Sequence, residues 1–263
     1  MKDIFQIKLS GRELFVLAAL LGYESIFGIV DDALLTSGIE LKSQIKQTVQ
    51  QLERKKLIRY DLDGTLYIKP DLRRTIDCIC CAETVGCFST NIGSGKKIAV
   101  YVLEKDAYTV TVENAGSGKY KVHLTDSIDA SKIIPTKILN VQDCEMDEML
   151  LLEEAQAAQT LIEAFNAEEA KSRIDKHTQD NRSSEIISQI LSKKCGFMSF
   201  QIHRRTKQLY KAVCNGLFVN VENRTISVSI DNNDILRFKA VPANRVLNYI
   251  NPYLRLYEEE GVQ

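Results

Sequence analysis

An alternation of apolar and polar residues from Cys195 to Leu254 limits most strongly what this chain can fold into. Such alternation is typical of antiparallel strands whose sheet is buried on one face. Asn215 and Gly216 form a two-residue hairpin signal, and Pro242 stands where a first helical turn accepts a residue without an amide hydrogen. The run therefore predicts a meander that ends in a packing helix. Its predicted strands are residues 197–204, 209–214, 217–221, 225–230 and 235–241.

The first half of the chain carries a second series of the same kind. This series closes with a last strand, the capping residue Ser127 and a helix over about 128–139. The same order of elements closes the later run. Two such meanders paired edge to edge would leave few strand edges exposed. The sequence therefore predicts an α+β fold, with two antiparallel meander-plus-helix units in a quasi-twofold arrangement around a shared sheet. The strands predicted in the first unit are 85–90, 97–103, 108–112 and 120–124.

The N-terminal segment is expected to resemble a winged helix. Ser10 is placed to cap a first helix, with Glu13 at the capping-box position. A third helix over 41–55 would bury its apolar residues and turn its polar face outward. The other elements expected in this segment are a second short helix over 28–35 and a wing hairpin of 57–60 and 65–68.

The region between the two meanders is first acidic and then polar. Residues 141–170 contain nine acidic residues and no Lys or Arg, and their apolar residues, Met149 and Leu150 among them, recur at helical spacing. We expect a long amphipathic helix there, a polar loop over 171–184 and a further helix over 185–194. The chain is thus divided into units 1–83, 84–140, 141–194 and 195–263.

Composition and motifs give little support to catalysis. The 263 residues carry a net charge of −1, and no apolar run is long enough to span a bilayer, which favours a cytoplasmic protein. Two Gly-Ser-Gly-Lys runs lack the spacing of a phosphate-binding loop, and the three histidines are isolated. Seven cysteines, an odd number, indicate reduced thiols rather than a disulfide framework. We therefore expect no enzyme, cofactor or metal, and buried structural thiols at Cys78, Cys80, Cys81 and Cys87.

A basic stretch in the second meander is the candidate binding surface. Residues 186–221 contain six Lys and Arg and no acid. A basic turn between the first two strands would orient a partner, while aromatic residues on those strands would supply affinity. The residues predicted to bind a partner are Phe197, Phe200, Arg204, Arg205, Lys207 and Tyr210.

The winged-helix character also leaves a DNA-binding regulator open as an alternative. In DNA-binding proteins of that architecture the third helix enters the major groove. However, residues 1–83 hold twelve basic and twelve acidic residues, so the segment offers no net attraction to phosphate. The residues that would contact DNA in this alternative are Lys42, Gln44, Lys46 and Gln47.

The layout as a whole resembles the EspG-like and EsaE-like bacterial chaperones of type VII (ESX) secretion. The features that carry the resemblance are the helix with Glu13-Leu14-Phe15-Val16-Leu17, the strand at Leu57-Ile58, the strand from Lys97 to Leu103, the helix from Glu185, the strand from Gly196 to Arg204, the hairpin through Gly216 and the last strand through Val241. The resemblance implies a quasi-twofold α+β fold in a cytosolic protein that binds a helical-hairpin substrate of the WXG or LXG type without catalysis. The winged-helix character is a departure from the family.

Overall fold

A computed structural model describes residues 4–29, 39–92, 96–106, 108–126, 149–152, 196–207, 209–221, 224–230, 236–241 and 250. No helix in these ranges is both long and apolar enough to cross a membrane. The elements are β1 (Phe5–Ser10), α1 (Gly11–Leu20), α2 (Ile39–Arg54), β2 (Ile58–Tyr60), β3 (Leu66–Ile68), α3 (Pro70–Cys81), β4 (Thr84–Ile92), β5 (Lys96–Lys105), β6 (Tyr108–Gly116), β7 (Lys119–Asp126), β8 (Met149–Leu152), β9 (Gly196–Thr206), β10 (Leu209–Val221), β11 (Arg224–Ile230) and β12 (Leu236–Ala240).

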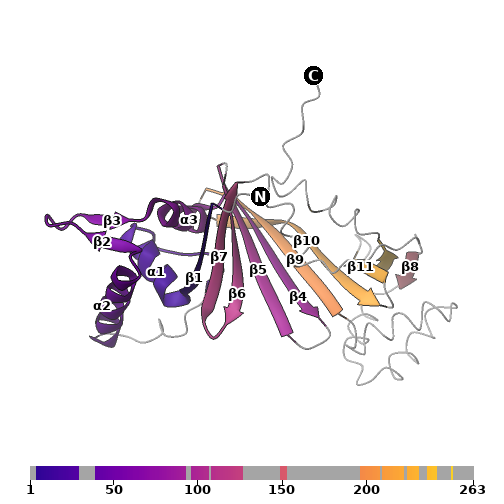
Figure 1. Ribbon diagram of the computed structural model, residues 1–263. Coiled ribbons are helices and arrows are strands. Elements are labelled where there is room, and N and C mark those ends of the chain that lie inside the picture. The colour runs from indigo at the N-terminus through magenta and orange to yellow at the C-terminus, as the bar shows by residue number, and fades with distance from the viewer. Residues whose placement is uncertain are drawn as a thin grey trace.

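Ten strands form one antiparallel sheet in the order β1-β7-β6-β5-β4-β9-β10-β11-β12-β8. The two meanders, β4 to β7 and β9 to β12, meet where β4 pairs with β9, with Phe88 opposite Phe200. The α+β class and the shared sheet are therefore confirmed. Figure 1 shows α1, α2 and α3 gathered at the end of the sheet that carries β1, with the small β2–β3 hairpin projecting from them.

Several predicted elements lie outside the described residues. They include the helices over 128–139 and 185–194, the polar loop over 171–184 and most of the helices over 28–35 and after Pro242. The quasi-twofold relation and the winged-helix likeness therefore remain predictions. The four-part division is untested, although β1 of the first predicted unit pairs with β7 of the second and both contribute to one apolar core.

Two predictions of local structure are wrong. Asn215 and Gly216 do not form a hairpin, because β10 continues through them as one strand with Gly216 opposite Phe200. Residues 149–152 belong to no helix but form β8, which pairs with β12 at the edge of the sheet. In both places pairing with another strand overrides the local signal.

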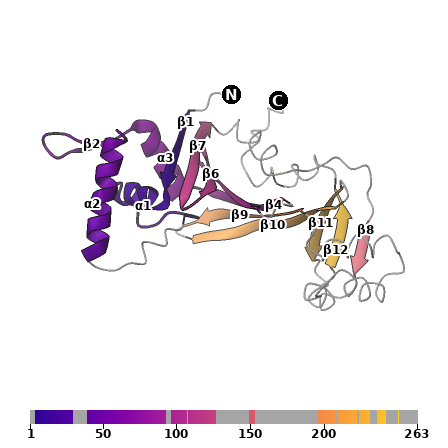
Figure 2. The ribbon, with the colours of Figure 1, turned by 60° about the horizontal axis from the view of Figure 1, so that its bottom comes forward.

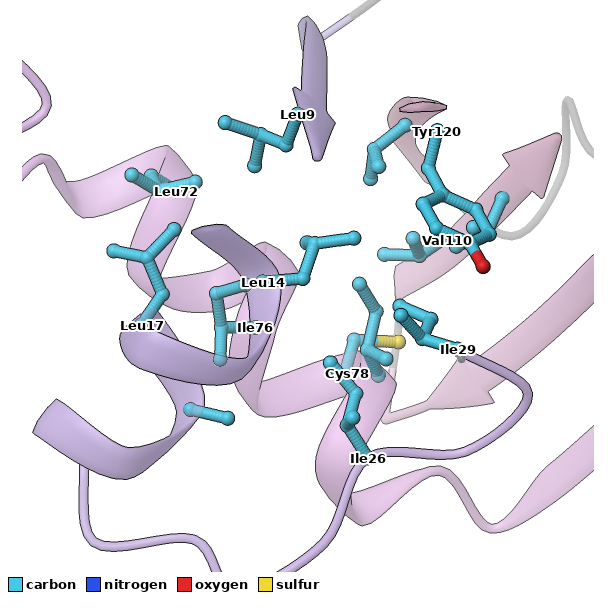
Figure 3. Packing of buried hydrophobic residues seen from close by; sticks show 14 of the residues in the cluster. Leu9, Leu14, Leu17, Ile26, Ile29, Leu72, Ile76, Cys78, Val110 and Tyr120 are labelled. Atoms are coloured by element: carbon cyan, nitrogen blue, oxygen red, sulfur yellow. The ribbon is translucent and has the colours of Figure 1, made fainter. Parts of the chain in front are cut away.

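The main core lies between the sheet and the helices α1 and α3. Side chains from β1, α1 and α3 are almost wholly buried there, and Figure 3 shows them converging. They include Leu9, Leu14, Leu17, Leu72 and Ile76. Burying one such side chain stabilises a protein by about 1.5–3 kcal/mol. The three elements are therefore held firmly against the face of β5, β6 and β7 on which α3 packs.

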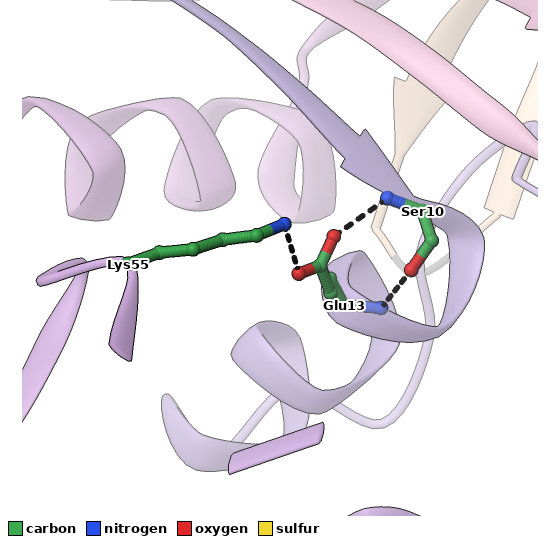
Figure 4. A network of polar contacts seen from close by, with 3 residues as sticks. All are labelled: Ser10, Glu13 and Lys55. Atoms are coloured by element: carbon green, nitrogen blue, oxygen red, sulfur yellow. Dashed lines mark hydrogen bonds and ion pairs between the residues drawn. The ribbon is translucent and has the colours of Figure 1, made fainter. Parts of the chain in front are cut away.

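A capping box fixes the start of α1, as the sequence predicts. The Ser10 hydroxyl accepts a hydrogen bond from the Glu13 amide at 3.1 Å, and the Glu13 carboxylate accepts one from the Ser10 amide at 2.9 Å. The same carboxylate, which is buried, forms an ion pair with Lys55 just beyond α2 at 2.5 Å (Figure 4). Glu13 thus joins β1, α1 and the end of α2 through one side chain.

Candidate partner-binding surface

Among the described residues, α3 packs on β5, β6 and β7, and Phe27 packs on the neighbouring part of the same sheet face. Phe27 belongs to the irregular segment after α1, and its ring lies 6.3 Å from that of Tyr101, 5.9 Å from that of His203 and 5.0 Å from that of Tyr210. Gly28 follows with a φ of +70°, and an added Cβ there would lie 2.7 Å from the Tyr101 ring. The segment can therefore lie flat on β5, β9 and β10 only with glycine at that position.

Beyond Phe27 the same face carries small, uncharged side chains, which we call the open sheet face. The strand register places Cys87 beside Tyr101, Ser89 beside Ala99, and Gln201 beside Asn215. These residues line a hollow of about 380 Å³. The open sheet face comprises Cys87, Ser89, Ala99, Tyr101, Ser199, Gln201, Asn215 and Leu217.

The chemistry of the open sheet face suits a partner without local charge. The side chains of Gln201 and Asn215 are exposed, and Leu217 is 37% exposed, whereas Tyr101 is half-buried. Burial raises the pKa of Tyr101 and brings the pKa of Cys87 to about 11, so both are neutral near pH 7. Because no residue of this face is ionised there, an uncharged segment can dock without stripping water from an ion.

Phe200, a predicted anchor, lies on the other face of the sheet. Its ring stacks between Phe88 and Phe218, at centroid distances of 6.1 and 5.8 Å, and is only 3% exposed. Phe200 is therefore buried in a second aromatic cluster, and its role as a partner anchor stays a prediction. Phe197 lies in β9 opposite Val219, and its side chain is outside the described part of the structure.

Tyr210 is half-buried and ties β10 to the end of α3. Its hydroxyl donates a hydrogen bond to the Ala82 carbonyl at 2.9 Å, and its ring packs against Phe27. Burial raises the pKa of Tyr210. The Tyr210 side chain thus packs beside the open sheet face and contacts other residues of this chain. Its role as a partner anchor stays a prediction.

The predicted basic turn is present at the β9–β10 connection. Arg204 and Lys207 are exposed, and Lys207 has a φ of +59°. Arg205 is half-buried, and its amide donates to the Glu83 carbonyl at 2.8 Å. Lys211 on β10 lies directly opposite Arg204, which extends the basic turn along the strand.

The residues of the DNA-binding alternative are only partly available. Lys42, Lys46 and Gln47 are exposed on α2, but Gln44 is half-buried, so its predicted exposure is wrong. Gln44 shares the inner side of the helix with Thr48, whose hydroxyl donates to the Gln44 carbonyl at 2.8 Å.

The tip of the β2–β3 hairpin is a further obstacle to DNA binding. It carries Asp61 and Asp63, which would repel phosphate at the point where a wing approaches a duplex. These observations do not favour a DNA-binding role.

Of the four cysteines expected to be buried, Cys78 is buried, whereas Cys80, Cys81 and Cys87 are half-buried. Cys78 is 2% exposed, and its thiol donates to the Leu103 carbonyl at 3.3 Å. Burial raises the pKa of Cys78, and that of Cys80, to about 12. In the described ranges no group of three or more His, Cys, Asp or Glu residues could hold a metal ion.

The open sheet face is not marked by a sequence motif, because its residues are mostly small and polar. One signal for it was available in the alternation of β4 and β9. Phe88 and Phe200 share one face of these strands, whereas Cys87, Ser89, Ser199 and Gln201 share the other. Large apolar residues mark the buried face, so the small polar positions mark the face that is partly open.

No family model and no curated protein matches the sequence. Among solved structures, the chain is similar to the Mycobacterium tuberculosis type VII secretion system chaperone EspG5, whose structure is in complex with the PE25-PPE41 dimer. The TM-score is 0.64 and the sequence identity 10%, over 98% of this chain and 99% of that chain. Because the similarity spans both chains almost completely, this protein has an EspG-like fold.

Proposed function

We propose that this protein is a non-catalytic, cytosolic chaperone of type VII secretion that binds the helical-hairpin end of a WXG- or LXG-type substrate. The observation that carries the proposal is the similarity of fold to EspG5 over nearly the whole chain. A large sheet with one uncharged open area also suits a protein that holds another protein rather than transforming a small molecule. No cofactor or metal takes part in this function.

The open sheet face offers the groups that the end of a helical hairpin needs. The tip of such a hairpin presents backbone N–H and C=O groups that have no partner within the helices. The amides of Gln201 and Asn215 can both donate and accept hydrogen bonds, so they can satisfy either kind of group. Tyr101 and Leu217 add apolar contact on either side of them.

The basic turn and the N-terminal segment have secondary roles in this function. Arg204 near the end of β9 and Lys207 in the β9–β10 connection steer an acidic partner toward the sheet, which raises the association rate more than the affinity. In this proposal the winged-helix-like segment serves as an interaction module, and the two meanders, which pair through β4 and β9, are related by a quasi-twofold arrangement.

Titration calorimetry with a purified WXG- or LXG-type protein from the same genome tests the proposal. We expect one substrate per chain, and at least tenfold weaker binding for Gln201→Arg with Leu217→Asp, because charge then enters an uncharged contact. Both positions are exposed, so the variant should fold as the parent does. The matched control is Lys8→Glu with Lys119→Glu, exposed positions on β1 and β7. Full-strength binding by the open-face variant would contradict the proposed site.

A further inference from the structure

The first half of β10 forms an edge of the sheet within the described part of the chain. β10 pairs with β9 from Leu209 to Asn220, but β11 pairs only with the part that begins at Leu217. Figure 2 shows β11 beside the far end of β10 alone. We call residues 209–215 the free edge of β10.

The free edge of β10 is exposed and partly apolar. Leu209 is 70% exposed and Val213 is 40% exposed, and Lys211 and Ala212 between them are exposed as well. An unpaired edge of this kind presents backbone groups that can pair with another extended segment. Main-chain hydrogen bonds then supply affinity, while the alternating side chains supply selectivity.

The positive charges beside this edge favour an acidic partner. Arg204 and Lys211 lie directly opposite one another on adjacent strands, and like charges in that position destabilise a sheet. Arg204, Lys207 and Lys211 form no ion pair with any acid among the described residues. Residues 186–221 also contain no Asp or Glu that could neutralise them. A carboxylate brought in by a third strand would relieve this repulsion.

The same features argue against a second copy of this chain as the occupant. Antiparallel pairing of two free edges would bring two sets of Lys211 and Arg204 together.

We infer that the free edge of β10 binds an extended segment of a partner protein in which acidic and apolar residues alternate. The segment adds as a strand, with its carboxylates beside Lys211 and Arg204 and its apolar residues on the side of Ala212. This goes beyond the proposed function, because the helical end of a substrate would lie on the open sheet face and not along this edge.

Fluorescence anisotropy with labelled eleven-residue peptides tests the inference on the full chain. The probe is a peptide of alternating valine and glutamate. Its first comparison peptide alternates valine and lysine, and its second carries proline at two central positions, which removes amide donors needed for strand pairing. We expect the valine–glutamate peptide to bind, the proline peptide to bind at least tenfold more weakly, and the valine–lysine peptide not to bind.

Variants and hydrogen exchange make the test specific to β10. Arg204→Glu with Lys211→Glu should weaken binding of the valine–glutamate peptide at least tenfold, whereas the matched control, Lys8→Glu with Lys119→Glu, should leave it unchanged. The peptide should slow amide exchange within residues 209–215. Equal binding of the proline peptide would overturn the inference, because charge alone would then explain the attraction. Absence of binding, or unchanged exchange in this segment, would overturn it as well.

Discussion

At the scale of single residues, Gly216 shows how tertiary packing decides a position that looks like a turn. A Cβ added there would lie 2.4 Å from Phe200 Cε1 and 2.7 Å from Cζ. The ring cannot withdraw easily, because Phe88 and Phe218 stack on either side of it. Glycine is therefore needed in β10 so that an aromatic ring can lie across the strand.

Replacing Gly216 should destabilise the protein. We expect Gly216→Ala to lower the free energy of unfolding by about 1–3 kcal/mol, the usual cost of overpacking a core. Asn215→Ala is the control, because Asn215 is exposed and its truncation should change the free energy by less than about 0.5 kcal/mol. Urea denaturation measures both. If Gly216→Ala changed the free energy of unfolding as little as the control does, the Phe200 ring would not be fixed against Gly216.

Cys78 provides a prediction about pH. Its pKa is raised by burial from an ordinary value of 9.0 to about 12, so the folded chain keeps the proton to higher pH than the unfolded chain does. The stability that this thiol contributes is therefore fully present below pH 9 and is lost as pH rises toward 12. The loss is at most about 1.4 kcal/mol for each pH unit in this window.

The comparison with Cys78→Ala isolates this effect from other groups that titrate at high pH. The wild-type chain should be more stable than the variant at pH 7, and the difference should shrink steadily from pH 9 to pH 11. Urea denaturation at each pH provides the two curves. A difference that stays constant, or grows, would mean that Cys78 ionises as easily in the folded chain as in the unfolded one.

At the scale of elements, α1 depends on a small polar network that the sequence predicts in part. Ser10 and Glu13 form the expected capping box, since its residues are only three apart and its geometry is local. The ion pair from Glu13 to Lys55 joins residues 42 positions apart, and no local pattern indicates it. The network fixes α1 to β1 and to the end of α2.

Removing either partner of the capping box should loosen α1. We expect Ser10→Ala to cost about 1 kcal/mol of stability. Glu13→Ala should cost more, about 1–3 kcal/mol, because the part-buried Ser10 amide and Lys55 both lose their acceptor. Thermal unfolding followed by circular dichroism measures both, with the exposed Glu53→Ala as the control. Equal stability of Glu13→Ala and the control would show that the network contributes nothing.

The sequence predicts most strands but not all of their limits. β5, β6 and β7 were found because alternation and turn residues agree there, and the described strands are longer than the predicted ones. The residues of β8 are predicted to be helical, and β10 is predicted as two strands joined by a hairpin, because an apolar run also fits a helix and Asn-Gly also fits a turn. Only the pairing of β8 with β12 and of β10 with β9 distinguishes these alternatives, and a single sequence does not show how far each pairing extends.

At the scale of the whole molecule, the pairing of β4 with β9 organises both the fold and the candidate site. It joins two meanders into one sheet and sets Ser89 beside Ser199 on the open sheet face. The sequence predicts the shared sheet from two similar series of strands. It does not predict which face stays partly open, because that depends on how far α3 and Phe27 extend across the strands.

Site-specific photo-crosslinking tests the central claim most directly. A photoreactive amino acid replaces Asn215 on the open sheet face in one variant and Lys42 on α2 in another, both at exposed positions. Each variant is mixed with a WXG- or LXG-type substrate and irradiated, and the crosslinked peptides are identified by mass spectrometry. We predict crosslinks from position 215 to the helical end of the substrate and none from position 42. Crosslinks from position 42 alone would contradict the account and assign the partner to the N-terminal segment.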